Sequence, residues 1–353
     1  MDKLKKLSKQ RLFLPIMCVL LVLAVNIVYD ISQGNPFYSF FRITMENGLL
    51  SGRLVSIINR GSEVAILAIG MTLVVSASGG IDISVGSLIA LDCMLLAWGT
   101  GQGISAAVMC ALVIVLGIVF GLVQGFCVGY LNIQPFIVTM AGMFFARGMT
   151  AVVSTNQLSI TQDTSALFYG WANAKIQLPA FLGYVNSKGK LQIPYIRVSV
   201  VIALVVLILI FLVLRYTKFG RSLYAVGGSE QSAAMMGLDV KKAKMKAYVL
   251  SSFLCSIGGI CYCLNTMSGS VSQATGLEMD AIASCVIGGT LLTGGVGNVF
   301  GSFFGVLING TISSLVKTNG KLASSWPNIL TAVLLCFFIV LQSVFAHLKE
   351  KNK

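Results

Sequence analysis

Charged residues are scarce in this chain. Of its 353 residues only 10% are charged, 56% are hydrophobic, and the mean hydropathy is +0.88. Soluble domains carry about 25% charged residues, so this chain has too few to cover a surface in water. The scarcity excludes a soluble enzyme, a secreted disulfide scaffold and a disordered protein. We therefore predict an all-α, polytopic integral membrane protein.

Residues and motifs for metal or nucleotide chemistry are also missing. The single histidine is His347, near the end of the chain, and the nine cysteines all lie in apolar runs, where cysteine behaves as a small hydrophobe. No GxxxxGK[ST], GxSxG, HExxH or paired CxxC pattern occurs. We expect no metal, no cofactor bound by this chain and no catalytic residues, so the chain is not predicted to be an enzyme.

Negative charge is in short supply, with 12 acidic against 25 basic residues and a net charge of +13. The excess predicts orientation in a membrane rather than nucleic-acid binding, because cytoplasmic segments of membrane proteins are enriched in Lys and Arg. Fifteen basic residues fall in residues 1–12, 215–247 and 346–353, and nine fall in the longer segments 30–60, 154–197 and 317–327. We predict a basic cytoplasmic N-terminus (1–12), one membrane domain (13–345) and a cytoplasmic tail (346–353).

Apolar runs fill most of that domain, and a helix needs about 20 apolar residues to span a bilayer. The first run follows the basic start and is interpreted as an uncleaved helix rather than a signal peptide, since no small-residue cleavage site precedes Asp30. Two short runs, 84–98 and 279–294, are candidates for half-membrane pieces. About ten segments are predicted, over residues 13–28, 61–77, 84–98, 104–129, 134–153, 196–214, 248–266, 279–294, 297–316 and 328–345.

Two glycine-rich segments, 78–84 and 276–297, interrupt this pattern, one in each half of the chain. Irregular backbone at membrane depth occurs where it is buried in protein or lines a water-filled cavity, and paired breaks are typical of transporters. We therefore predict a translocation pathway near these breaks. For Asp82 the alternative is a helix cap. The candidate pathway residues are Gly79, Gly80, Asp82, Ser84, Asp280, Gly288 and Gly289.

Glycines also recur every four residues in two of the apolar runs. Small residues at that spacing form a flat stripe that lets helix backbones approach closely. We predict a packing role for them rather than a ligand site. The stripes are Gly117, Gly121, Gly125 and Gly129 in one run, and Gly297, Gly301 and Gly305 in the other.

The largest segment predicted to be cytoplasmic is 215–247. Within it, 229–236 suits a short helix, with Ser229 as its N-cap, Glu230 in its first turn and Gly237 at its end. Ala233, Ala234, Met235 and Met236 give this helix a small, adaptable apolar face that could dock on a partner. The alternative is a surface loop that only carries the charges that set topology. The candidate docking residues are Ser229, Glu230, Ala233, Ala234 and Gly237.

Several of these motifs together resemble the ribose-type sugar permeases of bacterial ATP-binding-cassette importers. The matching stretches follow the same order over about residues 50–345. Residues 141–148 and 281–297 look most like the galactofuranose permeases of this group, whereas the long segment 165–195 and the lysine-rich start depart from the pattern. The stretches that carry the resemblance are Ser78–Ser87 (SGGIDISVGS), Thr217–Arg221 (TKFGR) with the following GGSEQSAA, Ala281–Thr290 and Gly294–Gly297.

The resemblance implies one subunit of an importer in the bacterial inner membrane, moving galactofuranose, ribose or a similar sugar inward. A separate ATP-binding subunit would bind ATP and dock on 215–247, a second permease (identical or a paralogue) would complete the pore, and an external sugar-binding protein would dock near 154–195. Lipid surrounds such a subunit, and no nucleic acid is expected. Two alternatives remain. One is a self-contained carrier driven by protons or sodium, with Asp92 or Glu63 as its acid, and the other is a channel or scaffold.

Overall fold

The computed structural model describes residues 13–32, 44–46, 49–51, 53–174, 176–177, 184–185, 191–192, 195–318 and 326–351. The predicted basic N-terminus, 1–12, lies outside the described residues, as do the end of the tail and parts of the segment 154–195.

Helices dominate the described chain, and a helix covers most of each predicted apolar run. Their boundaries are set partly by caps: Pro135 occupies the first turn of α6, and Asp239 accepts a hydrogen bond from the backbone of Lys242 at the start of α11. The longer helices are α2 (Phe13–Ser32), α3 (Arg53–Ser78), α4 (Val85–Gly101), α5 (Ala106–Gly129), α6 (Pro135–Val153), α8 (Val198–Tyr216), α11 (Val240–Thr266), α13 (Val299–Thr318) and α14 (Trp326–Lys351).

Five described helices are long and apolar enough to cross a membrane, namely α3 from Leu54, α5, α6, α8 and α11. Shorter apolar stretches lie in α2, α4, α13 and α14. The predicted segment 279–294 forms only α12 (Leu277–Ile287), 11 residues long. At 1.5 Å per residue it extends about 17 Å, roughly half of a 30 Å hydrocarbon core. The chain is thus a polytopic helical membrane protein with one half-length helix.

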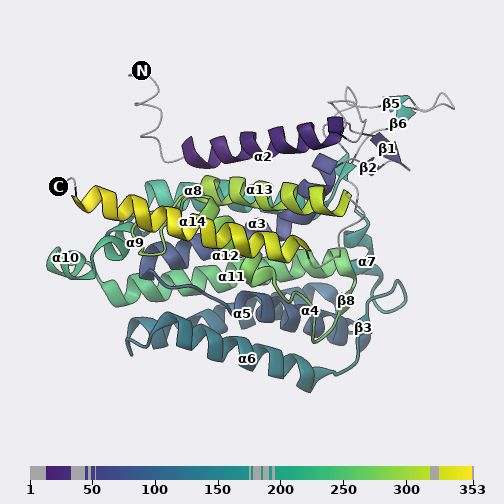
Figure 1. Ribbon diagram of the computed structural model, residues 1–353. Helices are drawn as coiled ribbons and strands as arrows, with labels where there is room; N and C mark the ends of the chain where they lie inside the picture. The colour runs from purple at the N-terminus through teal and green to yellow at the C-terminus, as the bar shows by residue number, and fades with distance from the viewer. Residues whose placement is uncertain are drawn as a thin grey trace.

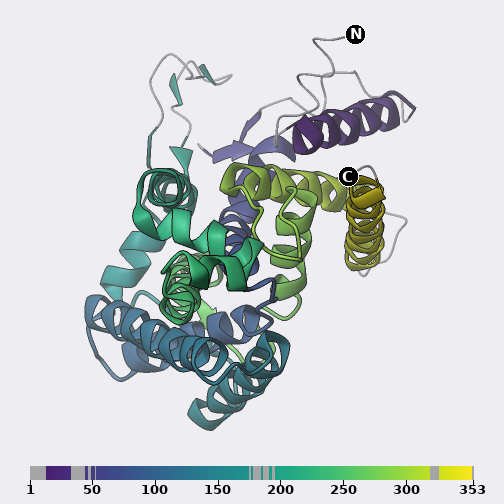
Figure 2. The ribbon, with the colours of Figure 1, turned by 90° about the vertical axis from the view of Figure 1, so that its left-hand side faces the viewer.

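The long helices lie side by side in a bundle (Figure 1). Seen along the bundle in Figure 2, α5 and α6 form one side, and α2 and α14 lie at the opposite margin. There α2 packs on α13, and α14 packs on α12 and α13. α3, α4 and α11 occupy the interior: α4 is buried along most of its length, and α3 contacts α11, α12 and α13. The polar breaks between these helices are therefore held inside protein.

The two ends of the bundle differ (Figure 1). One end carries α7 (Ala166–Ala172) and several short strands. One sheet has the strand order β1 (Thr44–Glu46), β2 (Leu49–Ser51), β7 (Tyr195–Ile196) and β4 (Ile176–Gln177). Two separate pairs are β3 (Leu158–Ser159) with β8 (Ser268–Gly269) and β5 (Tyr184–Val185) with β6 (Leu191–Gln192). Within the described residues, these short strands are the departure from an all-α chain. The other end carries α9 (Lys218–Gly228) and α10 (Glu230–Met235), together with the start of α2 and the end of α14.

Candidate functional site

The short helix predicted at 229–236 is present as α10. The side chain of Ser229 accepts a hydrogen bond from the backbone N–H of Ser232 at 3.2 Å, which caps its N-terminus. Gly237 follows the helix with a φ of +79° and donates its N–H to the carbonyl oxygen of Ala234 at 2.9 Å. This left-handed residue ends the helix, so α10 is limited to one and a half turns at the tip of the bundle.

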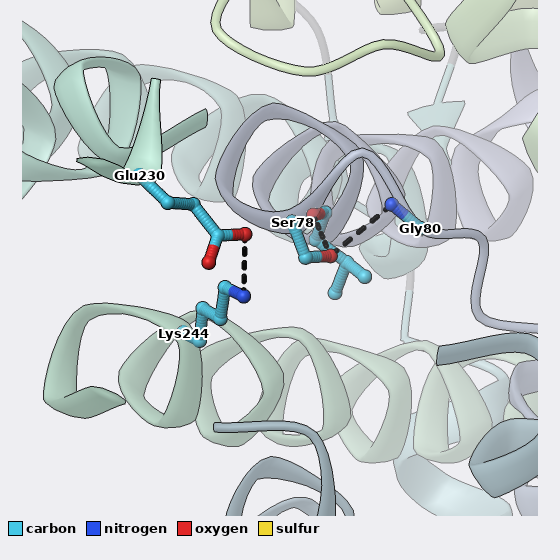
Figure 3. A network of polar contacts seen from close by, with 5 residues as sticks. Ser78, Gly80, Glu230 and Lys244 are labelled. Atoms are coloured by element: carbon cyan, nitrogen blue, oxygen red, sulfur yellow. Dashed lines mark hydrogen bonds and ion pairs between the residues drawn. The ribbon is translucent and has the colours of Figure 1, made fainter. Parts of the chain in front are cut away.

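One face of α10 is anchored to the rest of the protein. Ala233 is fully buried and packs in a small apolar cluster with Val226 of α9 and Ala243 of α11. Lys244 of α11 reaches the Glu230 carboxylate at 2.5 Å, as Figure 3 shows. These contacts fix the direction in which α10 points.

The opposite face of α10 is open. Ala234 is exposed, Met235 is 88% exposed and Met236 is 68% exposed. The expectation that Ala233 and Ala234 share a docking face is therefore wrong for Ala233, whose methyl group faces inward because α9 and α11 both lie on that side. The exposed apolar surface consists of Ala234 and the two methionines, whose flexible side chains suit an adaptable contact.

Immediately before α10, the end of α9 meets the two glycine-rich breaks. The N–H of Gly295 donates to the carbonyl oxygen of Ser76, near the end of α3, at 3.0 Å. Gly227 lies between them: a Cβ there would be 1.8 Å from the Ser76 oxygen and 2.6 Å from the Gly295 nitrogen. Gly79, with a φ of +62°, lies close to the carbonyl of Thr293, where a Cβ would be 3.1 Å from the oxygen. Three backbone segments thus touch at one point, which we call the glycine contact (Ser76–Gly79, Gly227–Gly228 and Thr293–Gly297).

A side chain reinforces the glycine contact. The hydroxyl of Tyr224, on α9, donates to the carbonyl oxygen of Gly297 at 3.0 Å. On the α3 side, the Ser78 hydroxyl donates to Val74 and accepts from the N–H of Gly80, the second network drawn in Figure 3. The break after α3 is therefore an ordered turn joined to α9.

Asp82 is fully buried at the start of α4. Its Oδ1 accepts hydrogen bonds from the backbone N–H of Ser84 at 2.9 Å and from the Ser84 hydroxyl at 2.6 Å. Gln124 of α5 donates to the same hydroxyl at 2.9 Å. The N-cap of α4 is Ser84, and α4 has no side-chain cap hydrogen bond. Asp82 thus does not cap the helix itself but braces the turn before it, which holds the break between α3 and α4 in one conformation.

Both glycine stripes lie at helix–helix crossings. Gly117, Gly121, Gly125 and Gly129 face the backbone of α11, where a Cβ on Gly121 would lie 2.8 Å from the carbonyl oxygen of Tyr248. Gly301 and Gly305 face α12, and Gly297 faces Ser76 of α3. Gly288, predicted to line a pathway, instead meets Gly301, where a Cβ would lie 2.4 Å from the Gly301 carbonyl carbon.

A cavity of about 790 Å³ opens between α3, α11, α12 and α13, at the end of the bundle that carries the strands. Of the predicted pathway residues, only Asp280 lines it. The other six lie elsewhere: Gly79 in the glycine contact, Gly80 against Pro135 of α6, Asp82 and Ser84 just before α4, and Gly288 and Gly289 in the turn after α12. The polar residues around the cavity are Ser56, Asn59, Arg60, Glu63, Arg197, Tyr262, Asn265, Thr266, Asp280, Asn309, Ser313 and Ser314.

Comparison with known proteins places the chain in a family. The model of the family described as "Branched-chain amino acid transport system / permease component" matches residues 53–341. The chain is 36% identical to the inner membrane ABC transporter permease protein YjfF of Escherichia coli strain K12, covering 88% of this chain and 90% of that one. No solved structure matches. The chain belongs to this permease family.

Two further relatives carry sugar names. The ribose import permease protein RbsC of Escherichia coli K12 is 34% identical over 82% of this chain and 85% of its own length. The galactofuranose transporter permease protein YtfT of the same organism is 32% identical over 88% and 85%. The resemblance to ribose-type sugar permeases is thus confirmed. The two identities are close, so they do not single out one sugar.

Sequence reasoning missed two parts of this permease. Gly227 was not singled out, although the Gly227–Gly228 pair at the end of α9 was a visible signal for a close backbone approach. The cavity asparagines Asn265 and Asn309 were also missed. A polar amide inside an apolar run is costly unless it is hydrogen-bonded, and that cost was the signal that could have found them.

Proposed function

We propose that this chain is the transmembrane permease subunit of an importer that moves a monosaccharide inward and is powered by a separate ATP-binding subunit. The observation that carries the proposal is α10, a capped, anchored helix with an exposed apolar face, in a chain of a family of transport permeases. A permease without its own nucleotide loop needs such a contact to receive force. The sugar class follows from relatives named for ribose and galactofuranose.

The importer comprises further subunits. The ATP-binding subunit docks on Ala234, Met235 and Met236, and it binds the ATP. A second permease, identical or a paralogue, completes the pore, and a sugar-binding protein docks on the opposite end. The end of the bundle with α9 and α10 faces the cytoplasm, because the basic residues of 215–247 lie there, as do the start of α2 and the end of α14.

The glycine contact provides the mechanical link. α10 follows α9 directly, and α9 touches both the turn after α3 and the turn after α12 through Gly227. Contacts this close leave no room for independent movement, because interiors are close-packed and shift between discrete arrangements. A displacement of α10 by the ATPase is therefore passed to the two broken segments that flank the interior of the bundle.

One observation favours a second candidate, a carrier that needs no ATPase. Asp92, on α4, is fully buried against Gly259 of α11, with Ser256 of the same helix beside its carboxylate. Buried acids inside a membrane bundle serve as proton or sodium sites in carriers. A self-contained carrier gives no role to the exposed face of α10, which is why the importer is the stronger proposal.

Transport by the reconstituted protein separates the two. The permease is placed in liposomes with the ATPase encoded beside it, and uptake of radiolabelled ribose and galactose presented with the neighbouring sugar-binding protein is measured. If the protein is an importer subunit, uptake requires ATP on the α10 side and is unchanged by a protonophore or a sodium ionophore. Uptake by the permease alone, abolished by an ionophore, would establish the carrier instead.

A further inference from the structure

The cavity between α3, α11, α12 and α13 has the size of a binding site. Ligand pockets occupy about 300–1,000 Å³, and this one measures about 790 Å³. It lies where α3 and α12 begin and α11 ends, next to β7 and β8, on the end opposite α10. In the proposed orientation a solute delivered from outside reaches it first.

The charges around the cavity balance. Arg60 and Arg197 are its two basic side chains, and Glu63 and Asp280 are its two acidic ones, so the formal charges are equal in number. A lining without net formal charge offers no net electrostatic attraction to an anion such as a sugar phosphate. A neutral solute needs no such attraction. The balance therefore favours a neutral ligand.

Both carboxylates are held in place by amides. Glu63 accepts hydrogen bonds from Asn265 and Ser62, and the Asn265 oxygen accepts from Arg197 at 2.7 Å. Oriented carboxylate and amide groups are the kind of fixed polar partners that give a pocket its specificity.

The second carboxylate has the same kind of support. Asn309 donates to Asp280 at 3.0 Å, and Thr331 donates to Asn309 at 2.8 Å. Asp280 stands in the first turn of α12, the half-length helix, and Asn309 stands on α13. The site thus joins the broken helix α12 to its neighbour α13. A ligand that contacts both residues would therefore bind differently if α12 moved relative to α13.

The rest of the lining suits a polyhydroxylated molecule. Hydroxyls come from Ser56, Thr266, Ser313 and Ser314, and apolar surface comes from Tyr262, Leu277 and Val306. The Oδ1 atom of Asn59 is buried without a hydrogen-bond partner among the described residues. A sugar presents donors and acceptors around its rim and C–H surfaces on its faces, and this mixture matches both.

We propose that this cavity binds a neutral monosaccharide within a single permease subunit, with the Asp280–Asn309 pair and Asn265 as the groups that recognise its hydroxyls. The inference rests on the proposed function and adds to it the place where the sugar is held.

Cysteine protection tests the site in the assembled importer in lipid nanodiscs. Ser313→Cys and Ser56→Cys place a thiol in the cavity, and Thr155→Cys places one on an exposed residue of the same end outside it, each in a background with Cys336→Ser. A polar maleimide is the labelling reagent, and D-ribose, D-galactose, D-fructose and L-leucine are the probes. Protection scales as 1 + [L]/Kd, so a transported sugar at about nine times its Kd slows cavity labelling about tenfold. Labelling at Thr155→Cys is expected to stay unchanged.

The outcomes are distinct. Labelling of both cavity cysteines at the same rate with and without every sugar overturns the site, and protection by leucine but by no sugar overturns the monosaccharide class. Should Ser313→Cys fail to assemble, the exposed position Ser56 supplies the same measurement. Asn309→Leu removes the amide at similar volume and is expected to abolish protection at Ser56→Cys. Uptake by the unlabelled parent importer is measured separately, so a failure of the proposed function is recognised independently of the cavity result.

Discussion

Gly227 of α9 lies against the carbonyl oxygen of Ser76 so closely that a methyl group on Gly227 would sit 1.8 Å from that oxygen. A methyl group added to its neighbour Gly228 would meet no atom within 4 Å. Two adjacent glycines in one helix thus differ in the space around them. The backbone of Gly228 also lies against Gly295, but a methyl group fits on Gly228 and clashes on Gly227.

Replacing Gly227 by alanine should therefore uncouple the importer. Overpacking costs about 1–3 kcal/mol, and 1.4 kcal/mol corresponds to about tenfold in an equilibrium, so we expect sugar uptake to fall about tenfold or more while the ATPase still co-purifies. Gly228→Ala is the matched control and should transport normally. Equal uptake by the two variants would contradict a role of the glycine contact in coupling.

A charged residue on the open face of α10 should prevent docking. Ala234→Arg places a long cation where the proposed ATPase cleft receives a methyl group, and burying an unpaired charge is costly. Loss of a hot-spot contact at an interface centre costs about 2 kcal/mol or more, so ATPase co-purification should drop at least about tenfold if α10 is such a contact. Ala234→Ser, small and polar, should remain near normal. Wild-type ATPase recovery and uptake with the arginine variant would mean that α10 is only a surface loop.

The sequence predicted the helices well because hydrophobicity decides which segments enter a bilayer. The run at 104–129 became α5 at 106–129. It predicted helix ends less well: α11 begins at Val240, whereas the apolar run begins at 248. Lys241, Lys242, Lys244 and Lys246 continue the helix outside the apolar layer, since lysine is a good helix former. Hydropathy marks the membrane layer rather than the helix.

The candidate site was predicted only in part, because it depends on which helices become neighbours. The cap and end of α10 follow from Ser229 and Gly237, which act locally. The inward direction of Ala233 depends on α9 and α11, and the cavity joins Glu63 to Asn265, some 200 positions apart in the chain. No local pattern in one sequence carries such a pairing.

Asp82 should act through the Ser84 hydrogen bonds rather than through contact with the solute. Asp82→Asn keeps an oxygen that accepts from Ser84, so it should retain folding and most transport. Asp82→Ala leaves the buried Ser84 N–H without its acceptor, at a cost of about 1–3 kcal/mol, and should lower the midpoint of thermal unfolding of the purified permease. Transport lost in both variants, with unchanged thermal midpoints, would indicate a direct role in the pathway.

The glycine stripe of α5 offers a test of packing between helices in lipid. Association there depends on close van der Waals contact, because lipid supplies no hydrophobic force between helices. Gly121 faces the backbone of Tyr248 and Val249 on α11, so Gly121→Leu must separate α5 from α11. We expect most of the folded, monodisperse protein to be lost in size-exclusion chromatography. Gly148→Leu is the matched control. Gly148 is exposed on α6, and a Cβ added there would meet no atom within 4 Å, so this variant should give normal yield. A normal elution profile for Gly121→Leu would show that the α5–α11 crossing tolerates a wider spacing than its backbone contacts imply.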